Sequence, residues 1–536
     1  MNSRCDRLLD NKYVYPLLLA LVFTVSILIQ WFALPGIDQS WFALMTRRML
    51  DGVALYKDFF EPNMPLITWI YAAPVALSEK LPVHPVVAVK LFTVAIIALC
   101  LIVYAQVLRH SSLWTEKQRR SLLLAIAVLL LLSAHTYIVF AQREHWLIIL
   151  TLPYVLLNLP SVRQKDFSSP ALVGLGALAA TGFCLKPYYF ILWLAVLGYR
   201  FFRARSWRVL FGPAEITIAC MTALYVAGIA LFTPYYFGYI RIVSQFYGDA
   251  GFTGETWLEK VVWFALVAGV GALVARAFKL FSIDPAAPYR SECVYLLWIA
   301  VGGYIEGLAQ FKTWAYTPYP FMVLGMLAVL AVILLKPRND LLSLALLGFM
   351  FYPILPIDNT YTQTELRKYD RVMQKAVMPH EHSRDLYFIS LINPPVMFFR
   401  ADSPLSWAGK FNHLFEVGAI MNRSPHYKQP TLTAKPGKEQ VERWMLDNIA
   451  DDLENKKPDL LIIEKRWAIN EPLSESFDFL RWFRKEPRII AFLQDYTLRK
   501  DVEVCYDPEN PNNPNRCNYR VFTRNDASQR IRVNWK

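Results

Sequence analysis

The sequence predicts a polytopic α-helical membrane protein with about 11 transmembrane helices, followed by a C-terminal extracytoplasmic α/β domain. Three observations lead to this fold class. The 536 residues are 55% hydrophobic and the mean hydropathy is positive, a composition that is unusual for a soluble protein of this length. Apolar runs recur through the first two thirds of the chain, and many of them have about 18–22 residues, which is long enough to cross a bilayer. The last third has no run of that length.

Each apolar run defines one expected span. The spans are predicted at residues 13–34, 86–108, 120–139, 146–160, 171–185, 188–204, 211–233, 259–275, 292–308, 318–335 and 340–357. The first run has no small-residue cleavage site and is predicted to be retained as a helix. The run at 146–160 is short for a full crossing. Segment 66–80 is apolar but short, and Pro74 lies inside it, so we expect an interfacial helix there.

The net charge of +13 has a placement that indicates topology. Its Lys and Arg excess lies in short clusters between the spans, which is the positive-inside pattern and does not indicate a nucleic-acid partner. An inner N-terminus and an odd number of spans place the tail outside. We therefore predict a multi-span domain over 1–357, with an outer first loop at 35–85, and a soluble outer domain over 358–536.

The tail changes character. Segments 384–391 ("RDLYFISL") and 458–466 ("PDLLIIEKR") read as strands, and segment 437–456 reads as an amphipathic helix, which together suggest a small α/β domain. Cys505 and Cys517 bracket a turn-rich loop and are disulfide candidates if the tail is outside. No Cys or His spacing in the chain indicates zinc, and no Walker or dinucleotide motif is present.

The outer first loop contains four acids, Asp38, Asp51, Asp58 and Glu61, of which the last two lie in "GVALYKDFFEPNMPL". In the plain interpretation, a solvated loop tolerates acids, and an anion just before a proline-started helix acts simply as a helix cap. The other interpretation is a functional cluster on the outer surface. Residues 35–65 alone do not decide between these interpretations.

Further polar residues follow on the same predicted side. Arg143, Glu144 and His145 lie in "AQREHW", and Lys186 lies in "CLKPYYF". A solvated turn and a snorkelling lysine are the plain interpretations. The alternative is a polar site in which Arg143 contacts a phosphate or carboxylate through two hydrogen bonds and Lys186 supplies a point charge.

The segment "EGLAQFKTWAYTPYP" contains Glu306, Lys312 and Tyr316 at the outer end of a span. Its aromatic residues are also typical of an interfacial belt, and its charges of a weak local ion pair. Cationic, acidic and aromatic groups together are, however, what a sugar-phosphate site requires. No Ser/His/Asp set is readable, which leaves carboxylates and cations as the candidates for chemistry.

The first-loop motif and the "QREH", "LKP" and "QFKTWAYTPYP" elements resemble the glycosyltransferase C superfamily. The branch is that of protein O-mannosyltransferases and lipid A aminoarabinose transferases, and the likeness covers roughly residues 13–357. It implies an integral-membrane glycosyltransferase of cell-envelope glycan or lipopolysaccharide biosynthesis. Such an enzyme moves a sugar from a polyprenyl-phosphate donor to a lipid, glycan or protein acceptor. The implied location is the bacterial inner membrane, with the active site and the C-terminal domain on the periplasmic side.

The resemblance also implies roles for single residues. Asp38 corresponds to the acid that activates the acceptor, Glu61 to the acid before the proline-started helix, and Lys312 and Tyr316 to donor-phosphate contacts. We assign Asp38 and Glu61 as catalytic candidates, and we add Asp58, Arg143, Glu144, His145, Lys186 and Glu306 as substrate-binding candidates. The chain departs from the pattern at Gln39, where a second acid is often found, and at Thr317, which stands in place of a His. No metal ligand is therefore assigned, and a requirement for a divalent metal is left open.

Two other classes of function compete with this one. A transporter or flippase of lipid-linked glycans predicts paired repeats and ionisable residues at mid-span. A polymerase or ligase of surface polysaccharide predicts a long outer loop between late spans, whereas the motif here lies in the first loop. The gathering of polar residues at one face favours the glycosyltransferase.

Overall fold

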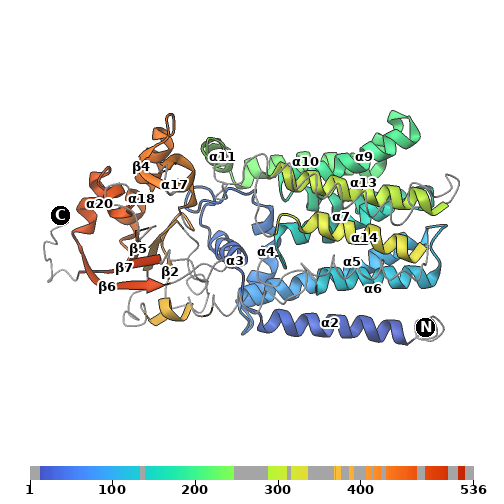
Figure 1. The fold of residues 1–536 in the computed structure, drawn as a ribbon, viewed down its shortest axis with the longest axis horizontal. Helices are drawn as coiled ribbons and strands as arrows, with labels where there is room; N and C mark the ends of the chain where they lie inside the picture. The colour runs from blue at the N-terminus through green and yellow to red at the C-terminus, as the bar shows by residue number, and fades with distance from the viewer. Residues whose placement is uncertain are drawn as a thin grey trace.

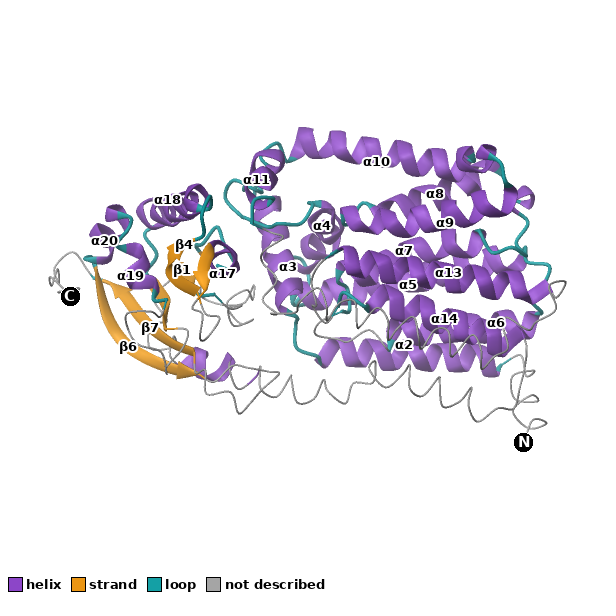
Figure 2. Cartoon of the chain, turned by 45° about the horizontal axis from the view of Figure 1, so that its top comes forward, coloured by secondary structure: helices purple, strands orange, loops and turns teal. Residues whose placement is uncertain are grey.

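The computed structural model describes residues 13–132, 139–246, 288–310, 316–335, 367, 370–375, 385–391, 406–412, 414–423, 430–466, 477–504 and 517–525. A bundle of roughly parallel and antiparallel helices forms one part of the molecule, and a β-sheet with its own helices lies against one end of that bundle (Figure 1). The second view shows the same two parts, with the strands confined to the C-terminal part (Figure 2).

The long bundle helices alternate in direction. They are α2 (Val14–Phe32), α5 (Pro85–Arg109), α6 (Glu116–Leu131), α7 (Arg143–Leu157), α8 (Ser169–Phe183), α9 (Phe190–Ala204), α10 (Pro213–Phe232), α13 (Pro288–Ala309) and α14 (Tyr319–Leu335). Every predicted span that falls on described residues coincides with one of them at least in part. The spans predicted at 259–275 and 340–357 lie outside the described residues. Helices α2, α5, α10 and α13 are long and apolar enough to cross a membrane by length and composition.

The surface of the bundle is apolar and its centre is a helix that no lipid can reach. Leu28, Leu99, Leu224 and Phe232 expose more than half of their side-chain surface, as is expected for groups that face hydrocarbon. Every residue of α7 is buried, and α7 packs against α5, α8 and α14. This central position explains why its 15 residues make a short span. The bundle is that of a multi-pass membrane protein.

The first loop, predicted to be outer, contains two helices. The interfacial helix predicted at 66–80 is α4 (Leu66–Ser78). Helix α3 (Ile37–Leu50) was not predicted, because its residues were interpreted as loop. Its sequence nevertheless carries helix signals: the Gln39 side chain accepts a hydrogen bond from the Gly36 N–H at the start of the helix, and two arginines lie in the last turn, where they complement the helix dipole. A further short helix, α11 (Tyr236–Val243), follows α10 at the same end of the bundle (Figure 1).

The C-terminal part contains a five-stranded sheet in the order β2-β1-β5-β7-β6. Strands β1 (Asp385–Ile389), β2 (Ser406–Trp407) and β5 (Leu460–Arg466) are parallel, whereas β6 (Tyr496–Val504) and β7 (Cys517–Arg524) pair antiparallel. The remaining elements are α17 (Phe415–Ile420), β3 (Met421–Arg423), β4 (Pro430–Ala434), α18 (Glu439–Lys456), α19 (Phe479–Phe483) and α20 (Pro487–Leu493). The segments that read as strands and as an amphipathic helix coincide with β1, β5 and α18. The proposed boundary at 357/358 lies outside the described residues, so the two-domain division stays a prediction.

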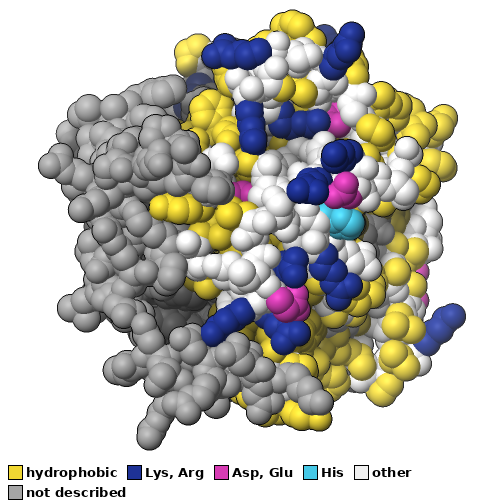
Figure 3. Space-filling model, turned by 90° about the vertical axis from the view of Figure 1, so that its right-hand side faces the viewer, with side chains coloured by type: hydrophobic (Ala, Val, Ile, Leu, Met, Phe, Trp, Pro, Cys, Tyr) yellow, Lys and Arg dark blue, Asp and Glu magenta, His cyan; other side chains and the backbone are white. Residues whose placement is uncertain are grey.

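The end of the bundle opposite the sheet is basic. Lys and Arg side chains gather on it, with few Asp and Glu among them (Figure 3). The connections between α5 and α6, α7 and α8, and α9 and α10 supply these residues. This asymmetry is the one on which the predicted orientation rests. The cytoplasmic location of this end stays a prediction.

Candidate active site

The predicted site residues that the structure describes lie at one end of the bundle, next to the sheet. Because the helices alternate in direction, the start of α7, the α8–α9 turn, the end of α13 and the start of α14 all reach this end (Figure 1). The first loop, with α3 and α4, lies there too. The arrangement therefore joins elements that are far apart in the sequence.

A buried arginine forms the centre of the site. Arg143, in the first turn of α7, is 1% exposed. Its Nη2 lies 3.7 Å from Asp38 Oδ2, and its Nη1 lies 4.0 Å from Glu61 Oε1. The guanidinium also lies over the ring of Phe42, 4.9 Å from its centroid. Nε and Nη1 make no hydrogen bond to any described residue. A buried guanidinium with two donors that no described residue uses can bind an anionic ligand.

Glu61 is a hydrogen-bonded counter-ion of this arginine. Its Oε2 accepts a hydrogen bond of 3.0 Å from Trp41 Nε1, and its Oε1 accepts one of 3.1 Å from the Asn63 main-chain N–H and another from the Asn63 amide. Burial raises the pKa of the Glu61 carboxyl, while Arg143 and the bonds from Asn63 lower it. Both oxygens of Glu61 thus have protein donors.

Asp38 is the accessible carboxylate. It lies in the first turn of α3, and its side chain is 30% exposed, against 7% for Glu61 and 2% for Arg143. Burial of the group raises the pKa of Asp38, and the charge of Arg143 opposes this shift. A carboxylate with a raised pKa and one partly open side can take a proton from a nucleophile.

A second ion pair lies beside the first. Lys186 Nζ contacts Glu144 Oε1 and donates a hydrogen bond of 3.1 Å to Gln310 Oε1, and Gln310 in turn donates one of 2.5 Å to Glu306 Oε1. The ammonium lies 5.2 Å from the ring centroid of Tyr316. Lys186 is therefore enclosed by a carboxylate, an amide and an aromatic face. Lys186 Nζ thus has two hydrogen-bond partners, whereas Nε and Nη1 of Arg143 have none among the described residues.

His145 has a structural place. Its Nδ1 accepts a 3.0 Å hydrogen bond from the Ala141 N–H, so its Nε2 donates to the Leu130 carbonyl at 2.8 Å. Both ring nitrogens are used by the main chain, and the side chain is fully buried. The predicted substrate contact of His145 is therefore not supported. The residue instead fixes the turn that precedes Arg143.

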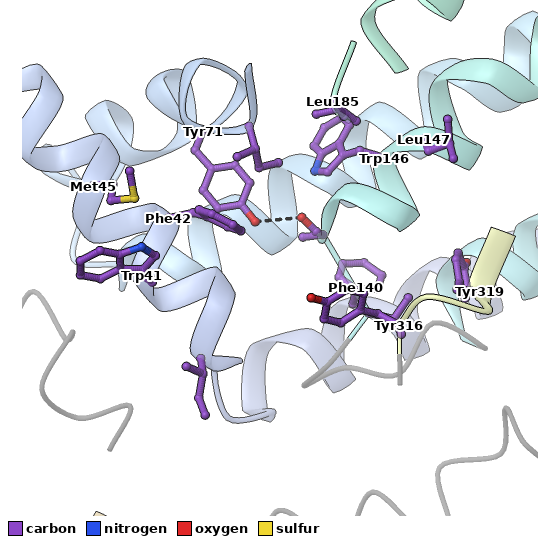
Figure 4. Close-up of a cluster of buried hydrophobic side chains, with 14 of the residues drawn as sticks. Trp41, Phe42, Met45, Tyr71, Phe140, Trp146, Leu147, Leu185, Tyr316 and Tyr319 are labelled. Carbon is purple, nitrogen blue, oxygen red and sulfur yellow. Dashed lines mark hydrogen bonds between the residues drawn. The ribbon is translucent and has the colours of Figure 1, made fainter. Parts of the chain in front are cut away.

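That turn is held from three sides. Ala141 has a φ of 62°, which is unfavourable for a residue with a Cβ. The Tyr71 hydroxyl donates a 2.8 Å hydrogen bond to the Ala141 carbonyl, and Figure 4 shows this bond within a cluster of buried hydrophobic side chains. Gln39 accepts a 2.9 Å hydrogen bond from the Gly36 N–H and donates to the Phe140 carbonyl. First-loop side chains thus hold the turn in place.

This role of Gln39 bears on the question of a metal. The amide occupies the position at which a second acid is often found, and both of its functional atoms bond to the main chain. No second carboxylate follows Asp38 directly, and the described residues contain no group of three or more His, Cys, Asp or Glu that could hold a metal ion. We derive no step through a metal.

The remaining predicted residues have different outcomes. Asp58 is half-buried, and within the described part of the chain its carboxylate makes no hydrogen bond or ion pair. Lys312 and Cys505 lie outside the described residues, and Cys517 is the first residue of β7 with an undescribed side chain. Their predicted roles stay predictions.

The positioning roles of four residues were not predicted from the sequence. Trp41, Asn63, Tyr71 and Gln39 bond to Glu61 or to the turn before Arg143. Asn63 lies two residues from its partner and was within reach of a local argument. Trp41 and Tyr71 contact partners 20 and 70 residues away, and no local pattern indicates such contacts.

Comparison with known proteins gives a set of structural likenesses. No family model and no curated protein matches the chain. ArnT from Cupriavidus metallidurans bound to undecaprenyl phosphate is 13% identical with a TM-score of 0.49, over 96% of this chain and 98% of that one. The arabinofuranosyltransferase AftD from Mycobacteria is 14% identical with a TM-score of 0.43, over 96% and 40%.

The archaeal oligosaccharyltransferase AglB from Archaeoglobus fulgidus, in complex with an inhibitory peptide and a dolichol-phosphate, is 10% identical. Its TM-score is 0.41, over 92% of this chain and 80% of that one. At these TM-scores and identities, the likeness does not carry an activity over to this chain.

Proposed function

We propose that the protein is an integral-membrane glycosyltransferase that moves a sugar from a polyprenyl-phosphate donor to a lipid, glycan or protein acceptor. The reaction takes place at the end of the bundle that faces the C-terminal sheet, on the periplasmic face of a bacterial inner membrane. The observation that carries the proposal is the buried guanidinium of Arg143, whose Nε and Nη1 make no hydrogen bond to any described residue. It lies beside the partly open carboxylate of Asp38.

The two groups divide the chemistry of a glycosyl transfer. The acceptor hydroxyl attacks the anomeric carbon and gives its proton to Asp38, which is the only site carboxylate described here that combines partial exposure with a raised pKa. The bond from the anomeric carbon to the phosphate oxygen breaks, and the polyprenyl phosphate leaves as an anion. The guanidinium of Arg143, whose Nε and Nη1 make no hydrogen bond to any described residue, stabilises the charge that develops on the phosphate.

The location suits a lipid-linked donor. The site lies where the apolar helices end, so a prenyl chain can lie along the exposed leucines of the bundle while its phosphate reaches the level of Arg143. Lys312 is a second phosphate candidate. Tyr316, whose ring faces Lys186, is placed to contact the donor headgroup.

Glycan and lipid profiling of a deletion strain by mass spectrometry tests the proposal. The strain should lack one sugar on one acceptor class, and the wild-type gene should restore it. Asp38→Asn should fail to restore it while the protein reaches the membrane in normal amount. Asp51→Asn is the matched control, because Asp51 is an exposed acid at the other end of α3, and it should restore the sugar. Full restoration by Asp38→Asn would refute the assignment.

A further inference from the structure

We propose that the C-terminal sheet positions Glu61 in the site, through Trp407 acting on Trp41 and through Lys410 acting on Phe60. The tail then has a defined part in the reaction: it fixes the counter-ion of Arg143. This inference rests on the proposed function, because it assigns a role within the same site.

The first connection runs through the main chain. The Phe60 N–H, next to Glu61, donates a 2.8 Å hydrogen bond to the Lys410 carbonyl. The Lys410 N–H in turn donates a 2.8 Å bond to Asp452 Oδ2, which also accepts a 3.2 Å bond from the Tyr387 hydroxyl. Asp452 lies on α18 and is 1% exposed. A buried carboxylate therefore holds the segment against which the first loop rests.

The second connection runs through two indoles. Trp407, the last residue of β2, meets Trp41 edge to face, with ring centroids 6.2 Å apart and planes at 75°. Trp41 donates the 3.0 Å hydrogen bond to Glu61 Oε2. The two indoles are 3% and 1% exposed, so neither has room to turn while the other is in place. The orientation of the donor to Glu61 depends on the sheet.

Arg48 adds a polar clamp to this contact. Its Nη2 donates hydrogen bonds to Ser406 Oγ at 2.8 Å and to the Trp407 carbonyl at 3.1 Å. Arg48 lies in the last turn of α3, the helix that begins next to Asp38. The sheet thus contacts the helix that carries the proposed base and the loop that carries its neighbouring acid.

The loss of Trp407 has a predictable electrostatic effect. The Trp41 N–H stabilises the charged form of Glu61, so a displaced indole raises the pKa of that carboxyl. The charged groups that face Glu61 are Arg143 from α7 and Asp38 from α3. A protonated Glu61 leaves Arg143 with Asp38 as its single counter-ion. The affinity for an anionic ligand is then expected to vary with pH over a range in which the affinity of the wild type stays constant.

The test uses the full chain in lipid nanodiscs, with undecaprenyl phosphate as the probe and native mass spectrometry as the readout over about pH 4 to 8. Trp407→Ala should weaken the affinity for the probe about tenfold, as expected for a lost hydrogen bond to a charged group. It should also move the acidic limb of the plot of affinity against pH to higher pH. Glu61→Gln should abolish that limb. The double variant should match Glu61→Gln alone, because both changes act through one group.

Lys438→Ala is the matched control. Lys438 contacts the Gln245 carbonyl at another part of the contact between sheet and bundle, so its effect should add to that of Glu61→Gln without a pH shift. Trp407→Leu, which keeps apolar volume, serves if the alanine variant does not fold. Additive effects of Trp407 and Glu61 substitutions on probe affinity overturn the inference.

A thermal-unfolding cycle over the same variants tests the connection without any lipid. If the wild type does not bind the probe, the proposed function fails as stated, and the unfolding cycle still decides the connection. Strict additivity of the Trp407 and Glu61 effects on Tm refutes it, whereas a coupled pair supports it.

Discussion

Replacement of Arg143 by Gln should remove the proposed phosphate contact and leave a shorter, neutral, polar side chain. The structure sets the magnitude. Nε and Nη1 have no acceptor among the described residues, and a hydrogen bond between a cation and an anionic acceptor contributes about 1.5–3 kcal/mol. Nε and Nη1 lie on opposite sides of the guanidinium, so one phosphate is expected to use one of them. Loss of that bond should lower the affinity for a polyprenyl phosphate about 10- to 100-fold.

The assay is equilibrium binding of undecaprenyl phosphate to the full chain in nanodiscs, scored on protein that elutes as a single folded species. Arg200→Gln is the matched control. Arg200 forms a buried ion pair with Glu215 at the opposite end of the bundle, so its loss perturbs the fold by a similar mechanism without touching the site. Affinity of Arg143→Gln within about threefold of wild type would refute the assignment, since that is under 1 kcal/mol.

The same variant should change the pH dependence of transfer. The charge of Arg143 lowers the pKa of Asp38 against the effect of burial, so its removal raises that pKa. Asp38 must be ionised to accept a proton, and activity is therefore lost as pH falls through its pKa. The acidic limb of the pH–rate profile should move to higher pH in Arg143→Gln. A limb that stays in place would show that Asp38 is not the group that titrates.

Two further substitutions test the framework around the site. Gln39→Glu removes the donor to the Phe140 carbonyl and places an acid opposite it, so the free energy of unfolding should fall by about 2–3 kcal/mol; unchanged unfolding in detergent would contradict this contact. Glu464, in β5, is buried with a pKa raised to about 7, so it disfavours the folded state as pH rises from its ordinary value through 7. Glu464→Gln should therefore stabilise the protein by about 3 kcal/mol at pH 8 and have little effect near pH 4. A pH-independent gain in Tm would refute the titration of Glu464.

The sequence predicted the helical bundle well, because apolar length and short polar breaks are local signals. Even the weak span at 146–160 is a helix, and its shortness follows from the full burial of α7, which no run length reports. The grouping of Asp38, Arg143 and Lys186 at one end follows from alternation of the spans. Helix α3 was not predicted, because its mixed polarity is typical of a loop, although Gln39 accepts a hydrogen bond from the Gly36 N–H at its start.

The contacts within the site were beyond reach for a different reason. Trp41 and Trp407 are 366 positions apart, and their edge-to-face contact depends on how the sheet lies on the first loop. Periodicity and spacing describe neighbours within an element, whereas this contact joins α3 to β2 across the whole chain. The same holds for the Gln39 contact with Phe140. Sequence analysis thus located the charged groups but not the residues that hold them.

The surroundings of the two acids beside Arg143 separate their roles. An aspartate and a glutamate that flank one guanidinium are equivalent in sequence terms, and both were predicted as catalytic. In the structure, Glu61 accepts hydrogen bonds on both oxygens from Trp41 and Asn63, so a proton taken up there would break bonds to its charged form. Asp38 retains an open side and has the arginine at 3.7 Å. We therefore propose that proton transfer falls to Asp38, and that Glu61 keeps the guanidinium oriented toward an incoming anion.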